Sequence, residues 1–136
     1  MAVPKFQITP NEIDQLVTTF YARARVDPVI GPVFLKAVGD DRESWVQHEA
    51  HIASFWRNAI GLDRSFSGNP MMKHLANKDV VPAHFSTWLD LFHQSAKDIL
   101  PPGKAASICA LADRIGESLQ MGLKQFRQPA MEPPRF

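Results

Sequence analysis

Apolar residues recur every three or four positions over most of this chain, which is the period of an amphipathic helix. The pattern predicts helices over residues 10–25, 32–38, 42–60, 82–100 and 104–127. No stretch shows the period-two alternation of a half-buried strand for long enough to predict one, and no internal repeat is present. The expected fold class is therefore all-α.

Local chemistry predicts where these helices begin and end. Residues 9–12, Thr-Pro-Asn-Glu, form a capping-box pattern with proline at the first helical position. Residues 44–47, Ser-Trp-Val-Gln, offer a second possible capping box near the start of the third helix. Proline and glycine separate the helices at residues 27–32 and 101–103, because the residue before proline avoids the helical conformation.

Length and charge indicate one soluble domain with a small partner. We expect a single domain over residues 1–136, with residues 1–8 and 128–136 frayed. The formal net charge of +1 argues against nucleic acid or an anionic membrane as a partner. The first ten residues lack the apolar run of a signal peptide, and no apolar window approaches the roughly 18 residues of a membrane span. We therefore expect a cytoplasmic protein.

A single cysteine and a pair of nearby histidines could suggest reactive or metal-binding chemistry, but the sequence does not favour either. The single cysteine, Cys109, lies on an apolar helical pattern, so we expect a buried, inert thiol. His48 and His51 are three residues apart, whereas the zincin motif places its histidines four apart with glutamate directly after the first. We do not expect a zinc site here, although a third ligand from a distant carboxylate is left open by the sequence.

Polar aromatic side chains fall on the apolar faces of four different segments. Any one of them would ordinarily be a core residue with a local hydrogen bond, but four would leave several polar atoms unpaired in a dry core. They favour a shared cavity that holds something polar at its centre, and a haem fits, because it takes a neutral imidazole as axial ligand. These residues are Tyr21, His48, His74 and Trp88.

The other histidines contrast with these four. His51, His84 and His93 fall on the flanks of their helices, so we expect them at the surface or at a helix end. His74 instead lies in a short apolar segment, residues 70–75, between a Gly-Asn-Pro turn and a polar loop at residues 77–79.

The order of these residues resembles the truncated haemoglobins, and within that family group III. Each matching run is weak, but their order and spacing from Phe20 to Phe92 are specific. The paired glycine motifs of the other two groups are not evident, as expected for the third. The runs are Phe20-Tyr21, Gly31-Pro32-Val33-Phe34, Trp45-Val46-Gln47-His48 with Ile52 and Phe55-Trp56, Gly68-Asn69-Pro70 with Lys73-His74-Leu75, and His84-Phe85 with Trp88-Leu89-Asp90-Leu91-Phe92.

The resemblance implies a shortened globin fold in which two pairs of antiparallel helices sandwich a haem b, one pair being residues 10–25 with 42–60. It implies that His74 is the proximal iron ligand and that Tyr21, His48 and Trp88 are the distal hydrogen-bond donors. Further residues are expected against the haem: Phe34 as a wedge, Ile52, Phe55, Leu75 and Phe92 as apolar contacts, and Lys73 toward a propionate.

The function implied by the resemblance is binding of dioxygen, nitric oxide or another diatomic ligand. Three polar donors suit nitric oxide or peroxide detoxification, or oxygen supply to a terminal oxidase, with a reductase as partner for the iron. Two alternatives remain. One is a haem-based sensor or carrier without turnover, which the lack of an output domain disfavours. The other is a haem-free helical interaction module.

Overall fold

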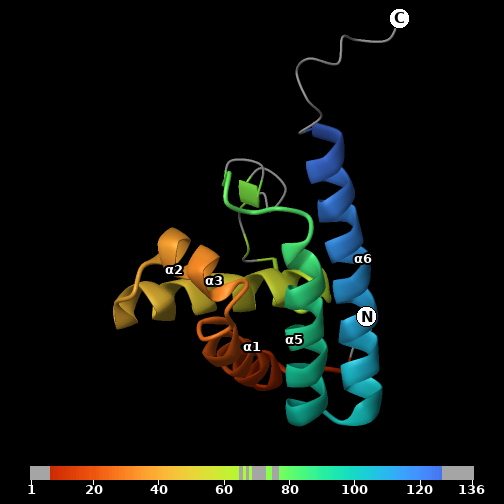
Figure 1. The fold of residues 1–136 in the computed structure, drawn as a ribbon. Coiled ribbons are helices and arrows are strands. Elements are labelled where there is room, and N and C mark those ends of the chain that lie inside the picture. The colour runs from red at the N-terminus through yellow and green to blue at the C-terminus, as the bar shows by residue number, and fades with distance from the viewer. Residues whose placement is uncertain (1–6, 65, 67, 69–72, 75–76, 127–136) are drawn as a thin grey trace, which may run out of the picture.

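The structure is a computed structural model that describes residues 7–64, 66, 68, 73–74 and 77–126. Within these residues the chain is helical and contains no strand, so the all-α prediction is confirmed (Figure 1). The helices are α1 (Pro10–Ala24), α2 (Gly31–Val38), α3 (Arg42–Ala59), α5 (His84–Ile99) and α6 (Pro102–Phe126).

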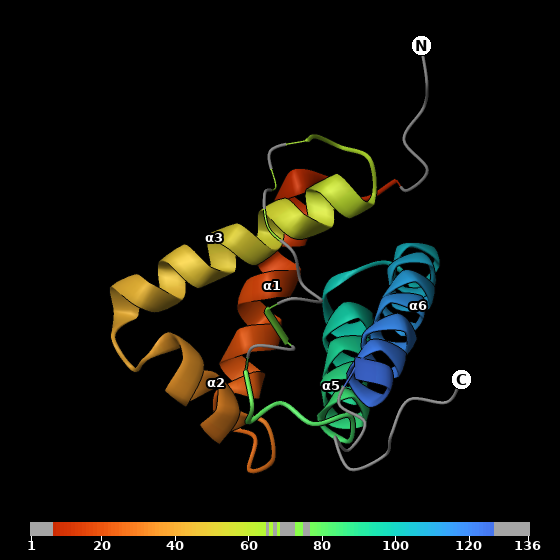
Figure 2. The ribbon, with the colours of Figure 1, turned by 90° about the horizontal axis from the view of Figure 1, so that it is seen from above.

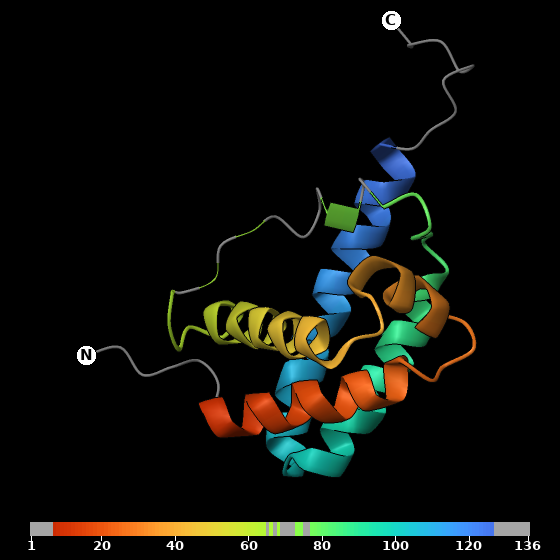
Figure 3. The same ribbon diagram turned by 90° about the vertical axis from the view of Figure 1, so that its left-hand side faces the viewer.

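Helix α1 joins two layers of the molecule. It packs against α3 on one side and against α5 on the other, and α5 packs along α6. Figure 1 shows α5 and α6 running side by side, Figure 2 shows α1 crossing α3, and Figure 3 shows these two helices one above the other. The pairing of α1 with α3 is the pair that the resemblance predicted. The short helix α2 packs against α3, on the side of the molecule away from α6 (Figure 2).

The first helix begins as its sequence predicts. The Thr9 hydroxyl accepts a hydrogen bond from the Glu12 amide at 3.1 Å, and the Thr9 amide donates to the Glu12 carboxylate at 3.0 Å. Ile8 belongs to the residues that were expected to be frayed, and only 2% of its surface is exposed. Ile8 and Ile13 occupy the positions of a hydrophobic staple, which explains the burial of Ile8 one residue before the cap.

Helix α3 begins at Arg42, as predicted, but Asp41 caps it, because its carboxylate accepts from the Ser44 amide at 2.9 Å; the possible capping box starting at Ser44 was wrong. Helices α5 and α6 begin at a different residue from the one predicted. Helix α5 begins at His84, and Pro82 lies in the turn before it, where its carbonyl accepts from Phe85 at 3.1 Å. Helix α6 begins at Pro102, two residues early, because proline is tolerated in a first turn whose N–H groups lack helical partners.

The core lies where α1, α3 and α5 meet. Three aromatic rings stack through it: Phe92 lies between Trp56 and Trp88, with ring centroids 5.0 and 5.3 Å away. Ala59, the last residue of α3, is exposed. Among the described helices, none combines the length and the hydropathy needed to span a membrane.

Gly31 lets the start of α2 approach the end of α1. A Cβ atom there would lie 2.8 Å from the Arg25 carbonyl oxygen and 3.2 Å from that of Ala24. Both obstacles are backbone atoms, which cannot turn away as a flexible side chain does. Only glycine therefore fits this position without moving α2, which carries Phe34 toward the core.

Replacing Gly31 with alanine should therefore destabilise the chain. We expect Gly31→Ala to lower the free energy of unfolding by about 1–3 kcal/mol, the usual cost of overpacking, as measured by urea denaturation. Gly103→Ala is the matched control, because nothing lies within 4 Å of the added Cβ atom. Equal stability of the two variants would contradict the packing argument.

Candidate functional site

The centre of the candidate site is an aromatic cluster built by α1, α2 and α3. Tyr21 is buried on the stripe of α1 that packs against α3, with 4% of its surface exposed. Its ring lies edge-on to those of His48 and Phe34, at centroid distances of 4.9 and 5.4 Å, and is tilted against that of Trp45 at 5.7 Å. The structure therefore brings together the predicted donors Tyr21 and His48 with the predicted wedge Phe34.

His48 carries the most informative atom of this cluster. Its Nε2 is buried and has no hydrogen-bond partner among the described residues. Leaving a buried polar atom unpaired costs on the order of 1–3 kcal/mol, so this nitrogen fits a site whose partner is a ligand. Burial lowers the pKa of His48 to about 4, and the neighbouring His51 adds to the shift. At neutral pH the imidazole is uncharged, with one donor and one acceptor nitrogen.

Tyr21 also stays uncharged at neutral pH. Burial raises the pKa of its phenol well above the ordinary value, and the charge of Glu49 raises it further. A protonated phenol can donate a hydrogen bond as well as accept one. Tyr21 and His48 thus place two neutral hydrogen-bonding groups in the same aromatic cluster.

Trp45 belongs to this cluster, although it was not among the predicted site residues and was named only in the matching run Trp45-Val46-Gln47-His48. Its ring centroid lies 5.7 Å from those of both Tyr21 and His48. Its indole N–H donates to the Gly39 carbonyl at 2.7 Å, so that donor is used to hold the turn between α2 and α3. Its spacing of three residues from His48 was the available signal, because side chains three apart share a helix face.

Trp88 approaches the cluster from α5 through an intermediate ring. The Phe20 ring lies 4.9 Å from Tyr21 and 5.6 Å from Trp88, measured between centroids. Trp88 also stacks on Phe92, with 13° between the ring planes. The Phe20 ring therefore links the third predicted donor to Tyr21.

His74 lies next to the first turn of α5. Lys73 and His74 are helical, and the His74 ring centroid lies 5.5 Å from that of Phe85. Phe85 is buried in the first turn of α5 and was not among the predicted site residues. The remaining residues of the 70–75 segment, Leu75 included, lie outside the described residues.

The other predicted haem contacts are more dispersed. Ile52 is half-buried against the core one turn after His48, and Lys73 is exposed. Phe55 lies between Trp56 and Phe66, at 5.2 and 5.3 Å between centroids. Phe92 is fully enclosed in the stack with Trp56 and Trp88. The structure does not bring Phe55 or Phe92 into ring contact with His48.

The remaining histidines lie where the sequence predicted. His51 is exposed against Phe66, His84 accepts from the Val81 amide at the start of α5, and His93 pairs with Asp113 at 2.7 Å. Cys109 is buried, which raises the pKa of its thiol. The described residues contain no group of three or more His, Cys, Asp or Glu side chains that would hold a metal ion by themselves.

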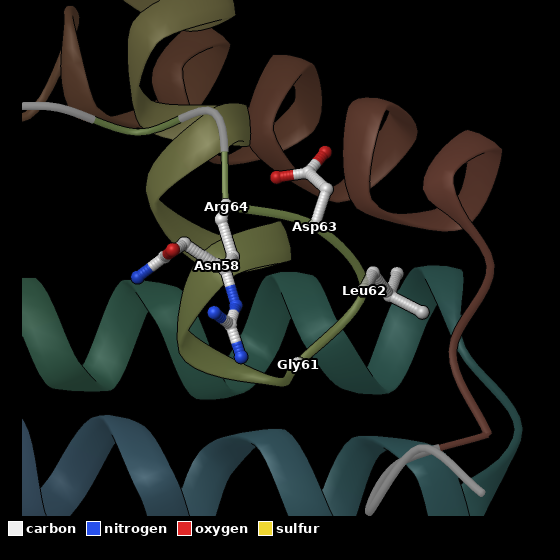
Figure 4. Close-up of a pocket in the computed structure, with 5 residues that line it drawn as sticks. All are labelled: Asn58, Gly61, Leu62, Asp63 and Arg64. Atoms are coloured by element: carbon white, nitrogen blue, oxygen red, sulfur yellow. The ribbon is translucent and has the colours of Figure 1, made fainter. Parts of the chain in front are cut away.

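A separate cavity of about 570 Å³ lies beside the end of α3 (Figure 4). It begins ten residues after His48, about 15 Å further along the helix at 1.5 Å per residue. It is therefore distinct from the aromatic cluster. Its lining residues are Asn58, Gly61, Leu62, Asp63 and Arg64.

The chain is similar to known proteins in both sequence and structure. No family model matches the sequence. The chain is 35% identical over 92 residues to Group 3 truncated hemoglobin ctb of Campylobacter jejuni, covering 67% of this chain and 72% of that protein. It also matches the crystal structure of a group III truncated hemoglobin from Campylobacter jejuni, with a TM-score of 0.85 and 28% identity. That match covers 93% of this chain and all of the other.

The buried imidazole of His48 predicts acid sensitivity. Its pKa falls from 6.5 to about 4 on folding, so the unfolded chain binds more protons between these pH values. Stability should therefore be lost as the pH drops through this window, by up to about 3 kcal/mol. Urea denaturation between pH 7 and 4 measures this loss in the unsubstituted chain and in His48→Gln.

His48→Gln should remove most of this pH dependence, whereas His51→Gln should leave most of it in place, because burial is the larger cause of the shift. An unchanged slope in His48→Gln would contradict the assignment to this imidazole.

Proposed function

The chain belongs to the group III truncated haemoglobins, and we propose from this that it binds haem b and a small diatomic ligand. The observation that carries the proposal is the buried, unpartnered Nε2 of His48 beside the phenol of Tyr21. Such an atom suits a cluster that is completed by a polar ligand rather than a closed core.

The residues proposed to hold the haem combine one metal ligand with apolar walls. His74 is the proposed iron ligand, since imidazole is a common axial ligand of haem iron. Phe85 supports its ring at 5.5 Å. Lys73 is proposed to pair with a propionate. The proposed apolar contacts are Phe34, Ile52, Phe55, Leu75 and Phe92. When bound, the haem supplies an open iron coordination position for a ligand such as dioxygen or nitric oxide.

The proposed role of Tyr21, His48 and Trp88 is to donate hydrogen bonds to that ligand. Donors in a low-dielectric pocket act strongly on partial negative charge, and Tyr21 and His48 are uncharged at neutral pH. Strong donors slow ligand release, which suits turnover more than transport. We therefore propose nitric oxide or peroxide detoxification, or oxygen delivery, in the cytoplasm, with a reductase that returns the iron to its ferrous state.

Removal of the proposed iron ligand tests the proposal directly. His74→Ala should lose tight haem binding, because no other protein group is proposed to bond to the iron. The measurement is the visible absorption spectrum after reconstitution with hemin, where the Soret band should weaken or shift to that of free haem. His93→Ala is the matched control, since His93 pairs with Asp113 at the surface.

A normal histidine-ligated spectrum in His74→Ala would contradict the ligand assignment. An unsubstituted chain that takes up no hemin would instead support the haem-free alternative.

Loss of a proposed donor should speed ligand release. Tyr21→Phe and Trp88→Phe should each raise the dioxygen dissociation rate, with a loss of about 1–3 kcal/mol per hydrogen bond. Stopped-flow displacement of dioxygen measures these rates in the ferrous protein. Unchanged rates in both variants would remove Tyr21 and Trp88 from the ligand site.

A further inference from the structure

Glu49 directly follows His48 on α3, and it contacts Thr18 of α1 and Arg25, the residue that caps the end of α1. The Thr18 hydroxyl donates to its carboxylate at 3.1 Å, and the Arg25 guanidinium lies 4.0 Å from its other oxygen. Thr18 and Arg25 lie three residues before and four residues after Tyr21, so all three share one face of α1. Glu49 therefore contacts α1 on both sides of Tyr21.

Arg25 also contacts Trp45, whose ring packs against both Tyr21 and His48. Its Nε–H donates to the Tyr21 carbonyl at 3.3 Å, and its guanidinium carbon lies 4.8 Å from the ring centroid of Trp45. A planar guanidinium can stack on an aromatic face and pair with a carboxylate at the same time. Arg25 thereby links α1 to both Trp45 and Glu49 on α3.

We propose that Glu49 and Arg25 are positioning residues of the ligand site, which fix α1 against α3 and so hold Tyr21 and His48 in their observed contact. The consequence for a bound ligand rests on the proposed function. The physical reason is that both residues cross between the two helices within one turn of the donor pair. Without them the Tyr21 ring can shift relative to His48 while the apolar core stays packed.

The electrostatics of Tyr21 agree with this placement. After burial, the charge of Glu49 is the second cause that raises the pKa of the phenol, so the carboxylate acts on Tyr21 across the helix interface. The Glu49 side chain is only 17% exposed, so water screens this charge incompletely.

A double-mutant cycle on the haem-loaded protein tests whether Glu49 acts through Tyr21. Glu49→Ala should raise the dioxygen dissociation rate about 3- to 10-fold, and by less than about 2-fold when Tyr21→Phe is already present. The control is Glu117→Ala, an exposed glutamate of α6, which should leave the rate unchanged. Equal factors in both backgrounds, or no change in either, would overturn the proposal.

Glu49→Gln provides a variant that keeps the shape of the side chain. Its amide oxygen can still accept from Thr18, but the charge facing Arg25 is lost. The dissociation rate should rise in the same direction and less than in Glu49→Ala. A rate in Glu49→Gln that falls below that of the unsubstituted chain would contradict the positioning role.

A second measurement needs no haem, because the chain contains a single tyrosine. Labelling with 3-fluorotyrosine gives one ¹⁹F resonance, which reports the surroundings of Tyr21 alone. Glu49→Ala should displace this resonance, and Glu117→Ala should not. If the unsubstituted chain binds no haem, the proposed function fails while this displacement still supports the positioning of Tyr21. An unmoved resonance in Glu49→Ala would overturn the positioning role even in a chain that binds haem.

Discussion

The packing of α1 on α3 through the rings of Tyr21, Trp45 and His48 is the contact on which the site depends. Aromatic pairs in edge-to-face geometry contribute about 0.5–1.5 kcal/mol each beyond the area that they bury. This contribution offsets the free-energy cost of burying the unpaired Nε2 of His48. Without such an offset, an unpaired polar atom would be unfavourable in the core. The cluster is thus stable although it encloses an unpaired polar atom, and the proposed function requires that combination.

The other proposed site residues, Trp88 and His74, are positioned by ring contacts with residues of α5. Trp88 is held by stacking on Phe92, and His74 lies against Phe85, so α5 contacts the proposed iron ligand and carries a proposed donor. Phe20 connects Trp88 to Tyr21. Because α1 packs on both α3 and α5, a shift of α1 changes both groups of site residues together.

Much of the fold was predictable because helix formation is local. Apolar spacing located the five helices, and the Thr9–Glu12 cap was correct in detail, since it involves only residues three apart. The errors fall at helix ends, where neighbouring candidates compete. Asp41 and Ser44 both resemble caps, and only the backbone conformation at Asp41 decides between them. The burial of Ile8 likewise depends on its packing against the core rather than on its position near the terminus.

The sequence by itself determined the helical class, the family resemblance and the residues that carry polar groups on apolar faces, because each depends on spacing along one helix or on order along the chain. Only the tertiary structure decided which of these residues meet. It brought the Tyr21 ring into contact with that of His48 and left Trp88 in contact with Phe20. It also showed that Trp45, Phe85 and the Glu49–Arg25 pair contact these residues. Helical periodicity gives the direction of a side chain about its own axis, whereas a contact between helices also depends on their relative translation and crossing angle, which the packing of the whole core determines.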